Sequence, residues 1–427
     1  MKKSKAYRAI AVNRVDVAQV GLGHRGQPLN IGLDVGKYQL SAVARWPDGQ
    51  FERPWRVDNP EQLPDLVKLL EQLHQGHPLT VALEPSGTYG DPARQACTDA
   101  GLAVVRVSPK AAHDYAEVFD GVPSQHDGKD AAVVAELAAL GKAKPWPFRD
   151  RPDWEQQLHY WVDRVDAHRL IEMVWLGRLE ALLGRHWPEL TRLLKLSSAT
   201  LLRLVAHYGS PAAVAADGQA AAAKMQKWGK KFLAAGKVAA VLASAQATLG
   251  VRLGALDQRR LQEYAEQALA ARREVRRGKR QLRVLAPQEP VLQAQGKVVG
   301  VVTACVLWAG VGDPRDYDSG PAYRKAMGLN LVEHSSGTYQ GQLRISKRGQ
   351  PRVRRWLYLA VLRLIRQEGL RTWYRARKRR GKVATKKALV GVMRKLALAL
   401  HRLVVDGVVF EGRRLFPGQA KGARGRR

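Results

Sequence analysis

A run of short strand patterns between residues 31 and 107 constrains the fold more than any other feature. An apolar stretch, Ile31 to Val35, is followed by an alternating stretch, Tyr38 to Trp46, and a Pro-Asp-Gly turn leads into a third strand, Phe51 to Val57. Buried strands are also predicted at Leu79 to Leu83 and Leu102 to Val107, with helical patterns around them. Three antiparallel strands followed by alternating helices and strands are the order of a ribonuclease-H-like α/β fold.

The rest of the chain is predicted to be mostly helical. Residues 154–285 are almost entirely helix-compatible, with breaks near Gly209-Ser210-Pro211 and Asp217-Gly218. A ragged a/d pattern over residues 253–285 indicates either a coiled-coil arm or an ordinary helical subdomain. Apolar faces predict two more helices close to the C-terminus, one from Val353 to Leu364 and one from Leu389 to Leu403.

These patterns divide the chain into five predicted regions. They are a basic tail (1–28), an α/β domain (29–148), a helical or coiled-coil region (149–290), a mostly helical C-terminal domain (291–412) and a second basic tail (413–427).

Positive charge is concentrated in the C-terminal part of the chain. The whole chain carries 71 Lys and Arg against 38 Asp and Glu, a net charge of +33. Residues 341–427 hold 26 basic and 3 acidic side chains, whereas residues 31–150 hold 12 basic and 17 acidic ones. Such an excess predicts a polyanionic partner, because each neutralised phosphate releases a counterion. A protein that only packages nucleic acid would have no reason to keep a locally acidic domain.

The remaining composition narrows the class of protein. Two cysteines, Cys97 and Cys305, exclude a disulfide scaffold and suit a reducing cytoplasm. The longest charge-free stretch, Val298 to Gly312, is shorter than the roughly 20 residues that span a bilayer. We therefore expect a soluble, cytoplasmic protein without a membrane partner.

Four carboxylates fall where an α/β sheet presents groups to a shared crevice. Asp34 ends the first strand and Glu84 ends a later one, while Asp127 and Asp130 lie one turn apart at the start of a helix. Each acid alone has an ordinary explanation, as a turn residue, a solvated strand end or a helix cap. Four acids together would repel one another without cations, and oxygen ligands suit Mg²⁺, which can clamp the reacting oxygens of a phosphodiester.

The segments that hold these acids, LDVGK, LEPSGTYG and HDGKDA, resemble the DEDD-type transposases of insertion sequences, the bridge-RNA-guided recombinases. The resemblance covers residues 29–412. It implies a RuvC-like domain in which Asp34, Glu84, Asp127 and Asp130 hold Mg²⁺ and are catalytic.

A second resemblance to this family lies in AMGLNLVEHSSGTYQGQLRISKRG, residues 326–349. It implies that Ser336, directly before a glycine, is the nucleophile of a C-terminal transposase domain. Without the family, a turn or capping serine is the simpler interpretation. Basic residues that fit phosphate clamping follow the serine, although a solvated basic face explains any single one. They are Arg344, Lys347, Arg348, Arg352, Arg354 and Arg355.

The resemblance also implies partners. They are donor and target DNA, a noncoding bridge RNA that pairs with both, and further copies of the chain in a dimer or tetramer, with a composite site formed across subunits. It places the protein in the bacterial cytoplasm, associated with the nucleoid. The alternative function is a RuvC-like, structure-specific nuclease such as a junction resolvase, which would use the same four acids for hydrolysis and would not need Ser336.

Overall fold

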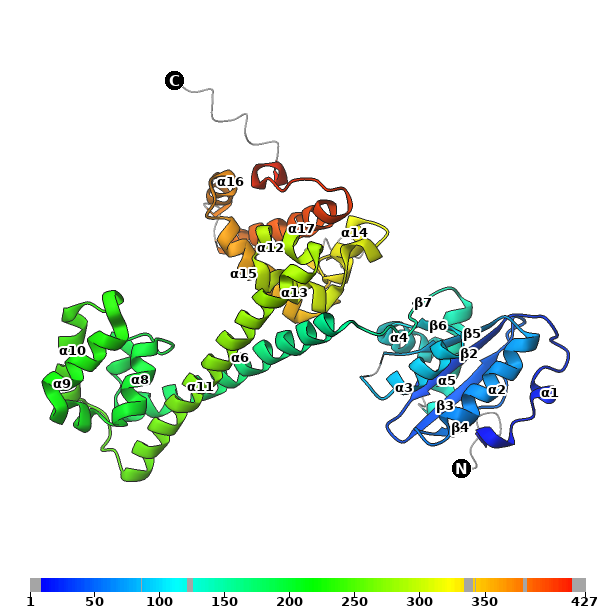
Figure 1. The fold of residues 1–427 in the computed structure, drawn as a ribbon, viewed down its shortest axis with the longest axis horizontal. Helices are drawn as coiled ribbons and strands as arrows, with labels where there is room; N and C mark the ends of the chain where they lie inside the picture. Colours follow the sequence, from blue (N-terminus) through cyan, green and yellow to red (C-terminus); the bar gives the residue numbers. More distant parts are fainter. Residues whose placement is uncertain are drawn as a thin grey trace, which may run out of the picture. The chain divides into compact units, whose positions relative to one another are not determined.

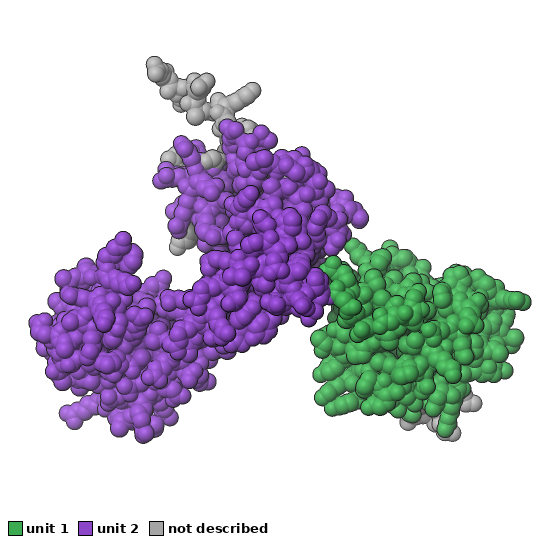
Figure 2. Space-filling model, viewed as in Figure 1, with its two compact units in different colours: residues 1–150 green, residues 151–427 purple. Residues whose placement is uncertain are grey.

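The structure is a computed structural model that describes residues 9–85, 87–120, 126–333, 341, 343–378 and 382–416. The chain divides into two compact units, residues 1–150 (unit 1) and residues 151–427 (unit 2), which Figure 2 distinguishes by colour. The described helices include none that is long and apolar enough to cross a membrane.

Unit 1 is built on a mixed seven-stranded sheet in the order β1-β4-β3-β2-β5-β6-β7. The pairs β2/β3 and β3/β4 are antiparallel, whereas β2/β5 and β5/β6 are parallel, so the predicted RuvC-like order of strands is confirmed. The strands are β1 (Ile10–Ala11), β2 (Leu29–Val35), β3 (Gln39–Arg45), β4 (Trp55–Asp58), β5 (Leu79–Leu83), β6 (Ala103–Arg106) and β7 (Lys144–Pro145).

Side chains from both faces of the sheet are buried because the unit has helices on each side. On β3, Ala42 and Ala44 belong to the core that includes leucines of α2, whereas Val43 packs with Ala131 and Ala132 of α5. This alternation is the period of two expected of a strand covered on both faces. The helices of the unit, visible in Figure 1, are α1 (Val17–Val20), α2 (Leu63–Gly76), α3 (Asp91–Asp99), α4 (Pro109–Asp120) and α5 (Asp127–Ala139).

The N-terminal segment is more ordered than a basic tail would be. Within the range predicted as a tail, β1 pairs in parallel with β4, and Val12 and Val20 are buried in the core of unit 1. A strand of two residues has no detectable period, and its partner lies more than 40 positions further on, so its sequence carries no local signal.

Unit 2 begins with two long antiparallel helices, α6 (Asp153–His186) and α11 (Ala255–Leu285). Two ion pairs cross between them, Arg164 with Glu274 at 2.7 Å and Arg272 with Glu172 at 2.6 Å. The predicted helical pattern of residues 253–285 is therefore a single continuous helix, paired with a partner from the same chain.

A helical lobe, residues 187–254, connects α6 to α11; we call it the distal lobe (green in Figure 1). Its buried core is shared with the adjoining ends of α6 and α11, and its predicted breaks are confirmed. Gly209, at φ 66°, ends one helix, the Ser210 side chain caps the next, and Gly218 kinks that helix. The helices are α7 (Leu190–Leu193), α8 (Ala199–Tyr208), α9 (Pro211–Gly229) and α10 (Ala235–Gln246).

The C-terminal part of unit 2 is mostly helical, as predicted, and it contains further helices besides the two that were located from the sequence. The predicted apolar faces appear as the buried sides of α15 and α17, and α16 lies between them in the chain. The elements are α12 (Pro290–Val299), α13 (Val301–Val311), α14 (Gly320–Ala326), β8 (Leu331–Val332), β9 (Arg344–Ile345), α15 (Pro351–Leu364), α16 (Glu368–Lys378) and α17 (Lys382–Val405).

Candidate catalytic site

Two of the four predicted acids lie at one edge of the sheet in unit 1. The strands β2 and β5 are parallel neighbours, and their pairing places Leu33 opposite Leu83. Asp34 and Glu84 directly follow that pair, one on each strand. Because parallel strands end at the same edge, these two carboxylates emerge side by side.

The other two acids reach this edge because α5 lies directly on β2. A Cβ atom at Gly32 would be 2.0 Å from the Ala131 carbonyl oxygen and 2.5 Å from the Ala135 nitrogen, so only glycine permits this approach. Asp127 and Asp130 both lie in the first turn of α5, and the His126 side chain caps this turn by accepting a hydrogen bond from the Lys129 backbone N–H at 3.1 Å.

The electrostatics show that the acids lie together. Burial, followed by the charges of Asp130, Asp127 and Glu84, raises the pKa of Asp34 to about 6. Burial and the charge of Asp130 raise the pKa of Glu84, and burial and the charge of Asp127 raise that of Asp130. The four acids therefore lie near one another, and the charges of His126 and Lys129 lower the pKa of Asp130 without cancelling its upward shift.

The chemistry of this cluster fits a hard divalent cation, which takes carboxylate oxygens as ligands. Among the residues that the structure describes, however, no three His, Cys, Asp or Glu side chains converge closely enough to hold an ion. The pKa of Asp34 is raised first by burial and then by the like charges of Asp130, Asp127 and Glu84, and a cation would relieve this repulsion. A cation would be held by Asp34, Glu84, Asp127 and Asp130 once these side chains drew together.

The predicted nucleophile, Ser336, and its neighbour Ser335 lie outside the described residues. They belong to the segment between β8 and β9, which pair antiparallel with Leu331 opposite Ile345. The role of Ser336 stays a prediction.

The six predicted phosphate-binding residues fall into two groups. Arg344, Lys347 and Arg348 are exposed, so their charges face solvent. The other three make contacts inside unit 2. Arg354 donates to the Gly349 carbonyl oxygen at 2.8 Å, and burial lowers its pKa. Arg352 and Arg355 form ion pairs with α6.

Two acids of α6, Asp163 and Asp166, hold the arginines of α15. Arg352 pairs with both of them and Arg355 pairs with Asp166. Neither acid was among the residues predicted from the sequence. The two aspartates are spaced by three residues along α6, and the two arginines are spaced by three residues along α15. This equal spacing is a sequence signal that could have suggested that the two pairs contact each other.

Comparisons with known proteins agree with the site. A transposase family profile, named for the DEDD transposase of IS110, matches residues 31–188, which include all four acids. A second, described as the transposase IS116/IS110/IS902 family, matches residues 294–376, which include Ser336.

Two relatives point the same way. A 43.6 kDa uncharacterised protein of insertion element IS110 from Streptomyces coelicolor is 26% identical over 396 residues, which are 90% of this chain and 95% of the relative. A Sinorhizobium fredii protein named as a candidate transposase, y4rJ, is 30% identical over 128 residues, which are 29% of this chain and 32% of that protein.

The RuvC-like sheet, the four acids at its edge and the two matching profiles define a DEDD-type transposase. A protein of this class cuts and rejoins DNA when an insertion sequence moves. The chain belongs to the IS110 family of insertion-sequence transposases.

Proposed function

We propose that this transposase is a bridge-RNA-guided DNA recombinase that uses two kinds of group, the four acids with Mg²⁺ and Ser336 as a covalent nucleophile. The observation that carries the proposal is the group of four neighbouring acids, in which burial and like charges raise the pKa of Asp34 to about 6. Structural aspartates in ion pairs have the opposite shift, so a raised value in a group of four acids favours a metal-dependent site.

The acids would hold the cation beside the scissile phosphate. When bound, Mg²⁺ supplies electrostatic stabilisation for the charge that develops on the phosphate oxygens. Asp34, Glu84 and Asp130 are partly buried, so their interactions with charge are stronger than in water, whereas Asp127 is exposed.

Ser336 would conserve the free energy of the broken phosphodiester bond in a covalent bond between the protein and the DNA. Its Oγ atom forms a bond to the phosphorus and loses its proton, the P–O bond to one deoxyribose breaks, and that deoxyribose oxygen leaves as a hydroxyl after gaining a proton. Rejoining is the reverse reaction with the hydroxyl of a different strand, so no nucleoside triphosphate is needed. A hydrolytic nuclease would pass the phosphate to water and could not rejoin the strands.

The charge distribution supports guidance by RNA. Residues 341–427 hold 26 basic and 3 acidic side chains, which suits contact with nucleic-acid backbones and leaves sequence recognition to base pairing. We propose that the active assembly contains further copies of the chain, with donor DNA, target DNA and the bridge RNA as partners.

The test is a search for a covalent adduct. Purified protein with the RNA transcribed beside its element is incubated with end-labelled DNA and Mg²⁺, and a denaturing gel is scored for label that protease treatment releases. We expect adduct with the wild type and with the matched control Ser335→Ala, and none with Ser336→Ala. Cleavage by Ser336→Ala with no adduct in any variant would instead establish the junction-resolvase alternative.

The role of the acids is tested separately. Asp127→Asn and Asp130→Asn remove charge at nearly constant volume from a helix start, so both variants should fold and bind RNA. We expect both to lose Mg²⁺-dependent cleavage. Full cleavage by either variant would contradict its assignment as a ligand.

A further inference from the structure

The distal lobe carries an excess of positive charge that its own fold does not use. Residues 187–254 contain nine Lys or Arg and two Asp or Glu. Both acids already have partners inside the lobe, because Glu189 accepts hydrogen bonds from Thr248 and from the Leu249 backbone, and Asp217 pairs with Lys224 at 3.0 Å. The family profiles end at residue 188 and resume at residue 294, so neither profile covers this lobe.

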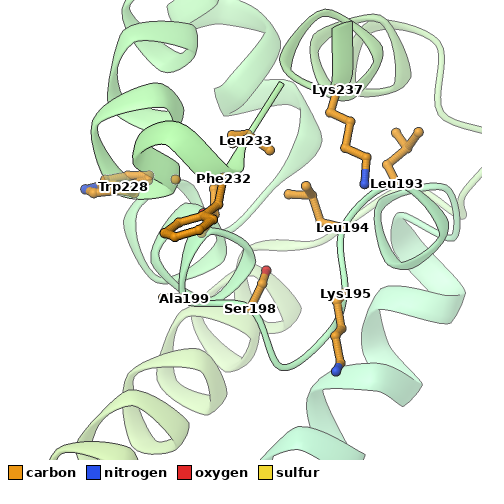
Figure 3. Close-up of a pocket in the computed structure, with 11 residues that line it drawn as sticks. Leu193, Leu194, Lys195, Ser198, Ala199, Trp228, Phe232, Leu233 and Lys237 are labelled. Atoms are coloured by element: carbon orange, nitrogen blue, oxygen red, sulfur yellow. The ribbon is translucent and has the colours of Figure 1, made fainter. Parts of the chain in front are cut away.

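Two of these cations line a cavity of about 360 Å³ between the α7–α8 connection and the α9–α10 connection of the lobe. Figure 3 shows Trp228 and Phe232 on one side of the cavity and Lys195 and Lys237 on the other. The volume falls within the range of pockets that bind small planar groups. Leucine and alanine side chains form most of the remaining lining, and Ser198 and Thr200 are its polar side chains.

Of the two aromatic side chains of the cavity, Phe232 is largely exposed, whereas Trp228 packs partly against the core of the lobe. Phe232 is 83% exposed, and Trp228 is half-buried against the ring of His207. The Lys231 ammonium lies 5.7 Å from the centre of the Phe232 ring. An exposed aromatic ring next to cations is the arrangement with which proteins stack unpaired bases and hold the adjoining phosphates.

The lysines of this surface are available for such contacts. Lys195, Lys231 and Lys237 are exposed, and no described carboxylate forms an ion pair with them. A protein partner would require complementary acids, and a membrane would require a wider apolar face. A nucleic-acid strand supplies both the bases and the anions that this surface lacks.

We propose that the distal lobe binds an unpaired DNA strand, with a base stacked on Phe232 and Trp228 and the flanking phosphates on Lys195, Lys231 and Lys237. DNA is the source because the protein acts on DNA, and strand exchange exposes unpaired segments. The proposal is independent of the chemistry assigned to the acids and to Ser336, since it concerns a different surface.

Photocrosslinking locates the contact within the full-length protein. A single-stranded oligodeoxynucleotide that carries 5-iodouracil is irradiated with the protein in the presence of a chelator, and the modified peptide is identified by mass spectrometry. The chelator removes any contribution of metal-dependent cleavage, so the outcome does not depend on the proposed recombination chemistry. We expect modification of Trp228 or Phe232. Adducts confined to the C-terminal basic region would overturn the proposal.

Charge variants give a quantitative second measurement. Lys195→Gln combined with Lys237→Gln should reduce the yield of the lobe adduct about tenfold at moderate salt, because two phosphates are no longer neutralised by the protein. The matched control is Arg252→Gln, which removes an exposed cation of the same lobe that does not line the cavity. Equal losses in both would show general attraction only and would overturn the specific site.

The stacking contact has its own control. Phe232→Ala should lower the yield of the Trp228 adduct about tenfold, whereas Leu249→Ala, which truncates a 92% exposed side chain of the same lobe, should leave it unchanged. Both side chains are exposed, so both variants should keep the wild-type unfolding temperature. An RNA strand of the same sequence is run in parallel. A lobe adduct with RNA alone would refute the assignment to DNA.

Discussion

Replacing Gly32 by alanine should separate the acids of the cluster without touching any of them. The added Cβ would lie 2.0 Å from the Ala131 carbonyl oxygen, whereas ordinary contact begins near ~3.5 Å. Helix α5 must therefore withdraw from β2 by about 1.5 Å. Because the obstacle is helix backbone and not the end of a flexible side chain, we expect the upper part of the overpacking range, about 3 kcal/mol.

This loss can be measured as a shift of the unfolding transition. About 3 kcal/mol corresponds to a decrease in Tm of about 6–12 °C for a unit of this size. The matched control is Gly76→Ala at the end of α2, where an added Cβ would have no neighbour within 4 Å. The control should unfold within about 1 kcal/mol of the wild type.

A second measurement ties the stability change to the site. Withdrawal of α5 admits water and moves Asp130 and Asp127 away from Asp34, so the pKa of Asp34 should fall from about 6 towards 3.8. Carboxyl NMR in metal-free buffer reports this value directly. A variant with an unchanged Tm and an Asp34 pKa still near 6 would refute the claim that close packing at Gly32 assembles the cluster.

Three further predictions concern other contacts. In the presence of a chelator, Asp34→Asn should stabilise the protein by up to about 3 kcal/mol above pH 6. This difference should vanish as the pH falls to 3.8, because Asp34 binds a proton at a higher pH in the folded wild type than in the unfolded chain. Urea unfolding at a series of pH values measures both the size and the sign of the effect. A double-mutant cycle on Arg272 and Glu172 should give a coupling free energy of about 1 kcal/mol, compared with about 0.4 kcal/mol for the exposed pair Arg402–Asp406. A coupling free energy near zero for Arg272 and Glu172 would contradict the role of this pair in joining α6 to α11. Neutralising the Arg and Lys residues of 375–382 should weaken DNA binding by a similar factor for all sequences and reduce the salt slope by about 0.9 for each phosphate that the protein no longer neutralises, as fluorescence anisotropy over a salt series would show.

The sequence was most informative where structure follows from local periodicity. Alternation and turn residues located β2, β3 and β5, and the rule that parallel strands end at one edge placed Asp34 beside Glu84. The apolar faces of α15 and α17 followed from helical spacing in the same way.

Features that depend on distant partners were not predictable in this way. The ion pair of Arg355 with Asp166 joins residues 189 positions apart, so the sequence around Arg355 indicated only a basic surface. Helix α16 was not predicted because its second half lies in a run of basic residues, and such a run is equally typical of a solvated segment without regular structure. The close approach at Gly32 likewise depends on α5, and a lone glycine in a strand does not reveal which backbone it faces.

The distal lobe leaves and re-enters the paired helices at almost the same point. The Val251 N–H donates to the Arg185 carbonyl oxygen at 2.9 Å, and the His186 ring lies 2.9 Å from the Val251 carbonyl oxygen. A segment whose two ends are joined in this way is an insertion at the tip of a helical hairpin, and its core also contains Leu183 of α6 and Leu261 of α11. Shortening the lobe to a turn would therefore expose these leucines to water, so an engineer who removes it must also replace them with polar residues.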